Sequence, residues 1–304
     1  MSSFRISRER SLYQSLDLKN IRQHQTTQAR LSEQMASGKR INRPSDDPSS
    51  FLRAQAMTQM TARHETYLNS VAEARGWVAQ TESTLDHMVE ILTQATVEAN
   101  RAVGDSRWTG DRRAIATRLE SLRDELVDAM NTQHNGEYIF GGNRTAAAPF
   151  EWPLPDPAPS PAPDLSGARI RDIGPTTSLQ VNIPGSELAT LDDGTSIIEA
   201  MQILIDGVRQ SDSDEMRNGF GLVENALDHV ARLTTIAGST SRRLTLAESN
   251  LRDAAILTEA RRSELEDTDT LDTILQLQRS ETGLAAALQV TARTLQSSIL
   301  DYLR

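Results

Sequence analysis

The sequence contains no cysteine. That absence excludes disulfide bonds, cysteine nucleophiles and thiolate metal sites, although it does not by itself name a cellular compartment. Aromatic residues make up only 4% of the 304 residues, and the mean hydropathy is −0.46. Leu, Ala, Ser, Thr, Gln, Arg and Glu dominate instead, a composition typical of largely exposed helices rather than of a thick globular core.

Long apolar runs are also missing. No stretch approaches the roughly 18 consecutive apolar residues of a membrane-spanning helix, so we expect no membrane insertion. The chain begins MSSFRISRERSLYQSL, which lacks the apolar segment of a secretory signal. We therefore expect no cleaved signal peptide.

The sequence offers no catalytic cluster. The histidines share no ligand spacing, and we interpret each as a solvated helix residue rather than a metal ligand. Asp46 and Asp47 could act as a carboxylate pair in acid–base chemistry, but the proline that follows favours helix capping. No nucleotide-binding glycine motif, P-loop or GxSxG motif is present. The sequence therefore predicts no enzyme, no cofactor and no metal site. The histidines are His24, His64, His87, His134 and His229.

Charge is distributed unevenly along the chain, whose formal net charge is −10. Residues 1–43 carry nine basic and three acidic side chains, whereas residues 264–304 carry three basic and seven acidic ones. The two ends are thus electrostatically complementary, which favours their pairing. A basic arm can also bind nucleic acid, but these arginines are dispersed among apolar positions, so we expect no nucleic-acid partner.

Both ends of the chain show helical periodicity. In residues 271–304 apolar side chains recur every three, four or seven positions, which predicts a helix with an apolar stripe. Residues 4–37 show a weaker stripe with a polar middle. A helix of this kind needs a partner, and we expect the other end of the chain and neighbouring molecules to cover the stripes. The predicted assembly stripe comprises Leu12, Leu16, Leu31, Met35, Ile274, Leu277, Leu284, Leu288, Leu295 and Ile299.

A turn separates the first helix from the second. Ser37-Gly38 ends the first helix, because glycine readily takes the left-handed conformation after a last turn. Asp47-Pro48 begins the second, since a carboxylate caps free N–H groups and proline suits the first helical position. A 3.5-residue apolar spacing predicts that this helix continues to about residue 103. The residues of this helix-turn signature are Gly38, Arg40, Asp46, Asp47 and Pro48.

A third helix is predicted over residues 111–133, so three helices joined by tight turns form an antiparallel bundle. The pattern then breaks at an Asn-Gly pair, and residues 138–142 look strand-like. The predicted junction between bundle and β segment is formed by Asn135, Gly136, Tyr138, Phe140 and Gly141.

Nine of the eleven prolines lie between residues 149 and 184. Two short strands are predicted at 168–173 and 178–183, joined by a turn, which makes a small β insertion. Helices resume at 195–209 and 212–265.

The predicted fold class is therefore mainly α. A long antiparallel helical rod, or coiled-coil bundle, is formed by the N- and C-terminal regions, with a small β insertion in the middle of the chain. We expect a terminal assembly region at 1–43 plus 266–304 and a bundle core at 44–137 plus 190–265. Residues 138–189 form a proline-rich β outer domain.

Four stretches carry a resemblance to the bacterial flagellin family, in particular to its hook–filament junction branch. The first is similar to the family's N-terminal signature, and the second to the junction branch's passage from bundle to β insertion. The β insertion departs from relatives in being short and rich in proline. The stretches are LSEQMASGKRINRPSDDPSS at 31–50, NGEYIFGGNRTAAAPF at 135–150, SLQVNIPGSE at 178–187 and AAALQVTARTLQSSILDYL at 285–303.

The resemblance implies a structural, extracellular component of the bacterial flagellum. Such a protein is exported through the flagellar type III apparatus, polymerises at the end of the hook and seats the flagellin filament. The implied partners are further copies of the chain, in a ring or helical layer, the hook-side junction protein, flagellin and a dedicated export chaperone. A terminal helix that becomes ordered only on assembly is compatible with the weak apolar stripe of residues 4–37, whose middle is polar.

Two alternatives stay open at this point. A minor flagellin would belong to the same family, although YIFGG followed by APF favours the junction branch. A cytoplasmic coiled-coil scaffold would explain the heptads, but it would not explain a proline-rich β insertion between helices.

Overall fold

The computed structural model describes residues 2–104, 109–153 and 164–302 of the chain, with the side chains of 18–102, 112–153 and 164–293. Its contacts divide the chain into two compact units. We call residues 1–63 with 255–304 the terminal unit, and residues 64–254 the central unit. The division falls within two long helices, α2 (Pro48–Gly104) and α6 (Ser213–Glu266).

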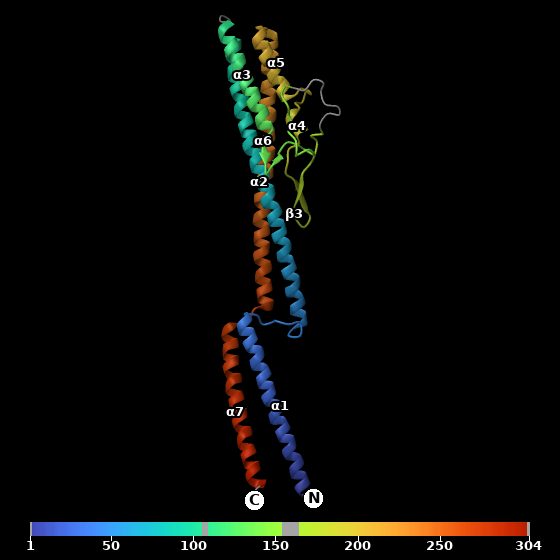
Figure 1. The fold of residues 1–304 in the computed structure, drawn as a ribbon, viewed down its shortest axis with the longest axis vertical. Coiled ribbons are helices and arrows are strands. Elements are labelled where there is room, and N and C mark those ends of the chain that lie inside the picture. Colours follow the sequence, from blue (N-terminus) through green and yellow to red (C-terminus); the bar gives the residue numbers. More distant parts are fainter. Residues whose placement is uncertain (1, 105–108, 154–163, 303–304) are drawn as a thin grey trace. The chain divides into compact units, whose positions relative to one another are not determined.

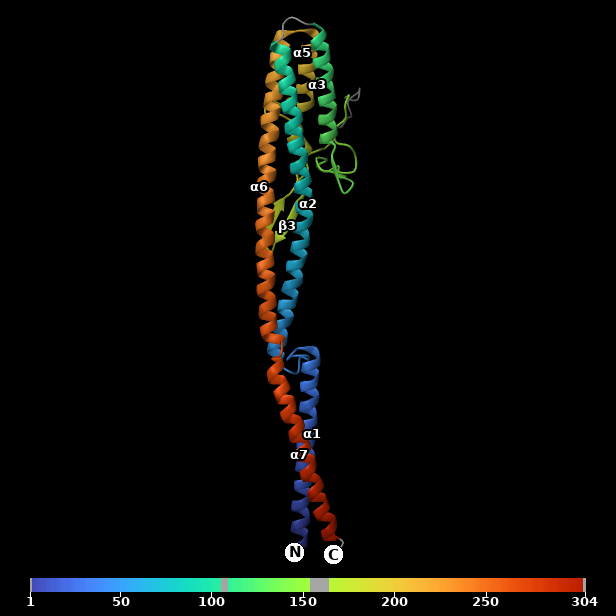
Figure 2. The same cartoon turned by 90° about the vertical axis from the view of Figure 1, so that its left-hand side faces the viewer.

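The terminal unit pairs the two ends of the chain. Helices α1 (Ser2–Ser37) and α7 (Thr270–Tyr302) lie side by side and antiparallel, as both views show (Figures 1 and 2). Asp269 begins α7, because its Oδ1 accepts hydrogen bonds from the main-chain N–H groups of Leu271 (3.0 Å) and Asp272 (3.2 Å). These bonds satisfy donors that have no partner inside the helix.

The central unit is a bundle in which α2 and α6 lie beside α3 (Thr109–Met130) and α5 (Ile197–Gln210) (Figure 2). Its core is built from the apolar positions that recur along these helices. Leu85 and Leu92 of α2, Leu119 of α3, and Val223 and Val230 of α6 are all fully buried. Asp212 caps α6 by accepting from the main-chain N–H groups of residues 214 (2.9 Å) and 215 (3.2 Å).

Two small antiparallel hairpins and a short helix complete the central unit. The first hairpin joins β1 (Gln133–His134) to β2 (Glu137–Tyr138), and the second joins β3 (Ile170–Gly174) to β4 (Thr177–Gln180). The second hairpin matches the predicted strands, although both of its strands are shorter than expected. The sequence pattern gave no sign of helix α4 (Gly185–Ala189), which buries Leu188.

The strand-like interpretation of residues 138–142 is wrong beyond Tyr138, where β2 ends. Ile139 and Phe140 are 1% and 0% exposed and belong to the core of the helical bundle. Both are residues with high strand propensity, but here burial between helices decides their conformation. The third helix also ends at Met130, before its predicted end at Gln133.

The fold class is confirmed: the chain is mainly α, with only two small two-stranded sheets among the residues that the structure describes. The interpretation of every histidine as solvated is wrong for two of them, because His64 and His229 are 7% and 8% exposed. His229 is held by a hydrogen bond between its Nε2 and the main-chain oxygen of Glu187 (2.8 Å).

Candidate assembly surfaces

Small and polar residues of α7 make close contacts with α1 in the part of the two helices that the structure describes. Of the described α7 side chains, the most buried are Thr273 (5% exposed) and Ser280 (8% exposed). The Ser280 hydroxyl donates to the main-chain oxygen of His24 at 3.5 Å. Gly283 lies so close to His24 that an added Cβ would stand 3.0 Å from the imidazole ring. The two helices therefore approach closely where α7 has no large side chain.

The structure divides the predicted assembly stripe. Leu31 is 2% exposed, and Leu277 and Leu284 are half-buried. Three other members are much more exposed: Met35 (36%), Ile274 (37%) and Leu288 (49%). The four remaining members lie in α1 and α7 but outside the described side chains; they are Leu12, Leu16, Leu295 and Ile299.

The terminal unit exposes further apolar residues that were not assigned to the stripe. Among those described, Leu271 (75%), Leu275 (51%) and Val290 (60%) belong to α7, and Leu18 (53%) belongs to α1. Contiguous exposed apolar surface is uncommon on a soluble monomer and marks interaction sites. The single chain thus leaves apolar surface of both terminal helices uncovered.

The helix-turn signature binds the end of α6. Gly38 takes a left-handed φ of +71° and ends α1. Main-chain hydrogen bonds join this turn to the end of α6 and the residues that follow it: Arg40 N–H donates to the oxygen of Glu266 (2.7 Å), and Thr268 N–H donates to that of Gly38 (3.0 Å). Lys39 also pairs with the Glu266 carboxylate at 2.5 Å. Positive charge at a helix C-terminus is favoured by the helix dipole.

Both aspartates of the helix-turn signature accept hydrogen bonds from main-chain N–H groups, as their position before Pro48 predicts. Asp46 Oδ2 accepts from the main-chain N–H groups of Asn42 (3.1 Å) and Arg43 (2.9 Å), which closes the turn. Asp47 Oδ1 accepts from the main-chain N–H of Ser50 (3.1 Å) and caps α2, whose first residue is Pro48. The hydrogen bonds from Ser50 lower the pKa of Asp47 to about 2.

The junction between bundle and β segment is a tight hairpin followed by a second turn. Asn135 and Gly136 have φ angles of +53° and +82°, as in the left-handed hairpin turns that favour Asn-Gly. Phe140 is fully buried, whereas Tyr138 is half-buried. Gly141 is required by packing, since a Cβ there would lie 2.5 Å from the main-chain oxygen of Arg144.

Several side chains that the sequence did not single out hold this junction together. Asn131 binds the main chain of Phe150 twice: its Nδ2 donates to the oxygen (2.7 Å), and its Oδ1 accepts from the N–H (3.1 Å). Arg169 pairs with Glu137 at 2.6 Å and lies 4.2 Å above the Trp77 ring. The hydrogen bond from Arg169 lowers the pKa of Glu137. The partners are distant in sequence, so no local pattern reveals them.

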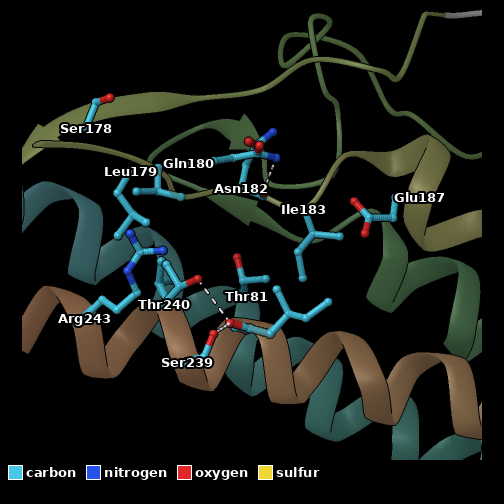
Figure 3. A pocket seen from close by; sticks show the side chains of 14 residues that line it. Thr81, Ser178, Leu179, Gln180, Asn182, Ile183, Glu187, Ser239, Thr240 and Arg243 are labelled. Atoms are coloured by element: carbon cyan, nitrogen blue, oxygen red, sulfur yellow. Dashed lines mark hydrogen bonds between the residues drawn. The ribbon is translucent and has the colours of Figure 1, made fainter.

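A cavity of about 430 Å³ lies between the second hairpin and helices α2 and α6. Figure 3 shows Leu179, Gln180 and Asn182 on one side and Thr81, Ser239 and Thr240 on the other, with Arg243 and Glu187 toward the two ends. Hydroxyl and amide side chains share this lining with apolar ones, and it holds no paired nucleophile and base. Within the described residues no group of three or more His, Cys, Asp or Glu side chains is arranged to hold a metal.

None of the helices, over the part of the chain that the structure describes, is long and apolar enough to cross a membrane.

The chain is a mainly helical protein whose two ends pair as α1 and α7, and whose central unit is a helical bundle with two small hairpins. Comparison with known families identifies its class. The family model "Bacterial flagellin N-terminal helical region" matches residues 11–145, and "Bacterial flagellin C-terminal helical region" matches residues 220–303. The chain belongs to the bacterial flagellin family.

Its relatives include hook-associated proteins. Flagellar hook-associated protein 3 of Escherichia coli is 27% identical over 294 residues, which cover 91% of this chain and 92% of that protein. Flagellar hook-associated protein 3 of Salmonella typhimurium is 34% identical over 136 residues, or 44% of this chain and 43% of the Salmonella protein. Flagellin B of Helicobacter pylori aligns over only 22% of its own length, at 28% identity.

Solved structures share the fold. A putative flagellar hook-associated protein from Vibrio parahaemolyticus superimposes with a TM-score of 0.67 at 17% identity, covering 73% of this chain and all of that one. FlgL from Bacillus cereus gives a TM-score of 0.56 at 20% identity and covers 67% of this chain and 96% of the FlgL chain.

Proposed function

We propose that this chain is a structural component of the bacterial flagellum that acts at the hook–filament junction, polymerising at the hook end and seating the flagellin filament. The observation that carries the proposal is the alignment to E. coli hook-associated protein 3, which covers more than nine-tenths of both chains. Alignment to flagellins covers only about a fifth to a third of their length, which disfavours a minor flagellin. Membership of the flagellin family also disfavours a cytoplasmic scaffold.

The terminal unit is the part that we assign to assembly. Ile274 and Leu288 of α7 are exposed in the single chain. Their side chains can therefore contact other subunits. Each fully buried leucine-sized side chain contributes about 1.5–3 kcal/mol, so neighbouring copies that cover these residues would stabilise the layer substantially. The predicted regions 1–43 plus 266–304, 44–137 plus 190–265, and 138–189 would then be the assembly, bundle and outer parts.

The chain's family implies assembly with other flagellar components, and we propose specific ones. They are further copies of this chain, the hook-side junction protein and flagellin, with a dedicated chaperone before export. Export through the flagellar type III apparatus would deliver the chain to the growing end, outside the cell.

Immunogold labelling of isolated flagella tests the location of the protein. An antibody raised against the central unit is expected to label a single band where the hook meets the filament. Label along the whole filament would instead identify the chain as a filament subunit. Flagella without label, from cells that make the protein, would refute both flagellar roles.

A further inference from the structure

Two Asn-Gly pairs occur in the sequence, at Asn135-Gly136 and Asn218-Gly219. An asparagine side chain followed by glycine is chemically vulnerable, because no side chain shields the next main-chain nitrogen from it. That nitrogen can attack the side-chain amide and displace ammonia. The two pairs have the same local sequence chemistry, so any difference in their reactivity must come from the fold.

The fold shields the Asn218-Gly219 pair and exposes the Asn135-Gly136 pair to solvent. Asn218 lies inside α6, and Gly219 is packed so tightly that an added Cβ would stand 2.5 Å from the Cα of Leu204. Asn135 and Gly136 are exposed at the tip of the β1–β2 hairpin, whose strands have two residues each. A two-stranded hairpin is only marginally stable by itself, so local opening of its tip needs little free energy. Opening lets Asn135 leave its left-handed conformation and reach the geometry of attack.

His134 contacts the group that must leave. The side-chain N–H of Asn135 donates a hydrogen bond to His134 Nε2 at 3.2 Å, because an amide nitrogen does not accept one. The imidazole is held in place by an edge-on contact with Trp77, at 5.9 Å between ring centroids. It also lies close to Gly76, where an added Cβ would stand 3.5 Å from the ring.

We propose that Asn135 is a site of spontaneous deamidation. Hydroxide from the solvent removes the proton of the Gly136 main-chain N–H, and that nitrogen bonds to Cγ of Asn135. The Cγ–Nδ2 bond breaks, and Nδ2 leaves as ammonia after taking a proton from water, which restores the hydroxide. Water opens the resulting succinimide at either carbonyl. The net reaction consumes one water, releases one ammonia and leaves aspartate or isoaspartate.

The product alters the junction between bundle and β segment. Isoaspartate lengthens the main chain at a turn whose two residues both have positive φ, so the hairpin register is lost. The new negative charge lies two residues before Glu137, whose carboxylate pairs with Arg169. The modification therefore disturbs the turn beside the ion pair of Arg169, the residue that lies over Trp77.

The test follows the folded full-length chain during long incubation in near-neutral buffer. Tryptic peptides are analysed by mass spectrometry, with enzymatic methylation of isoaspartate as a second readout. Fragmentation must place the change at Asn135, and the peptide that begins at Asn218 is the matched internal control. The expected result is conversion at Asn135 at least about tenfold faster than at Asn218, and equal rates in urea, where the fold is lost. An intact Asn135 in folded protein, when the unfolded chain reacts at both sites, overturns the proposal.

Discussion

The guanidinium of Arg40 donates a hydrogen bond to the main-chain oxygen of Leu265 at 2.8 Å, although the two residues are 225 positions apart in sequence. The main-chain N–H of Arg40 binds the next oxygen, that of Glu266. One residue of the turn after α1 thus satisfies two carbonyl groups that α6 leaves without partners at its end. In this way the helix-turn signature joins the two halves of the terminal unit.

Replacing Arg40 should loosen that connection. Arg40→Ala removes the side-chain bond to Leu265, and we expect a loss of about 1 kcal/mol in local stability. The readout is faster hydrogen exchange of the Thr268 N–H, which bonds to Gly38. Arg43→Ala is the control, because the Arg43 side chain forms an exposed ion pair with Glu33, and its main-chain bond to Asp46 is kept in the variant. Equal exchange in both variants would contradict the role given to Arg40.

Asp47 makes the start of α2 sensitive to acid. Its pKa is about 2 in the folded chain against an ordinary value of 3.8, so its carboxylate stabilises the fold. That contribution is complete above the unfolded value and is lost as the pH falls through about 2. We expect amides at the start of α2 to lose protection from hydrogen exchange over this range.

Asp47→Asn is the matched variant, because it keeps an acceptor oxygen but has no charge to lose. In Asp47→Asn, the amides at the start of α2 should not lose further protection from hydrogen exchange as the pH falls. A variant with the same acid dependence as the natural chain would show that another group is responsible.

Gly141 should tolerate no side chain. In Gly141→Ala the new methyl group would overlap the oxygen of Arg144, and we expect a loss of about 2 kcal/mol or more in the free energy of unfolding. Gly221→Ala is the control, since nothing lies within 4 Å of its added Cβ in the interior of α6. That change should stabilise the chain by roughly 0.5–1 kcal/mol. Urea denaturation measures both, and equal values would contradict the packing argument.

An acidic residue on the exposed stripe should block assembly without unfolding the chain. Leu288 is 49% exposed, so Leu288→Asp should leave the helical circular dichroism of the monomer unchanged. It should fail to restore filaments in cells that lack the natural protein. Leu295→Asp is expected to behave in the same way. Gln289→Asp, which places the same charge at an exposed polar position next in sequence, should assemble. Normal filaments with Leu288→Asp would contradict the role of the stripe.

The isolated chain should be a monomer whose ends are cut first by protease. Among the α7 side chains that the structure describes, the most buried are the small polar residues Thr273 and Ser280, so we expect that separating α7 from α1 costs little free energy. Limited proteolysis should remove about the first 40 and last 35 residues and leave a resistant middle. Mass spectrometry of the fragments identifies the cuts. Protection of both ends in the purified protein would count against this prediction.

Local signals in the sequence predicted the long helices, although not helix α4 or the end of α3. Asp47-Pro48 and Ser37-Gly38 act on the backbone of their own segment, so the end of α1 and the start of α2 follow from residue type alone. The heptad positions of α2 and α6 likewise identify the bundle core. Such features depend on neighbours three or four positions away.

The sequence pattern did not predict which distant segments are in contact. The leucines of α7 suggested the surface that meets α1, yet much of the close contact is made by Ser280 and Gly283. A periodic stripe shows that a helix has an apolar face, but it does not say which partner covers it. For the same reason the sequence did not predict that His64 is buried or that Asn131 forms hydrogen bonds with the main chain of Phe150.

Deletion of the gene tests the central claim most directly, with electron microscopy of the cells and an assay of flagellin in the medium. A junction protein predicts hooks without filaments and flagellin released unassembled into the medium. Hooks with no flagellin anywhere would identify the chain as the filament subunit. Cells with normal flagella would contradict the proposed function.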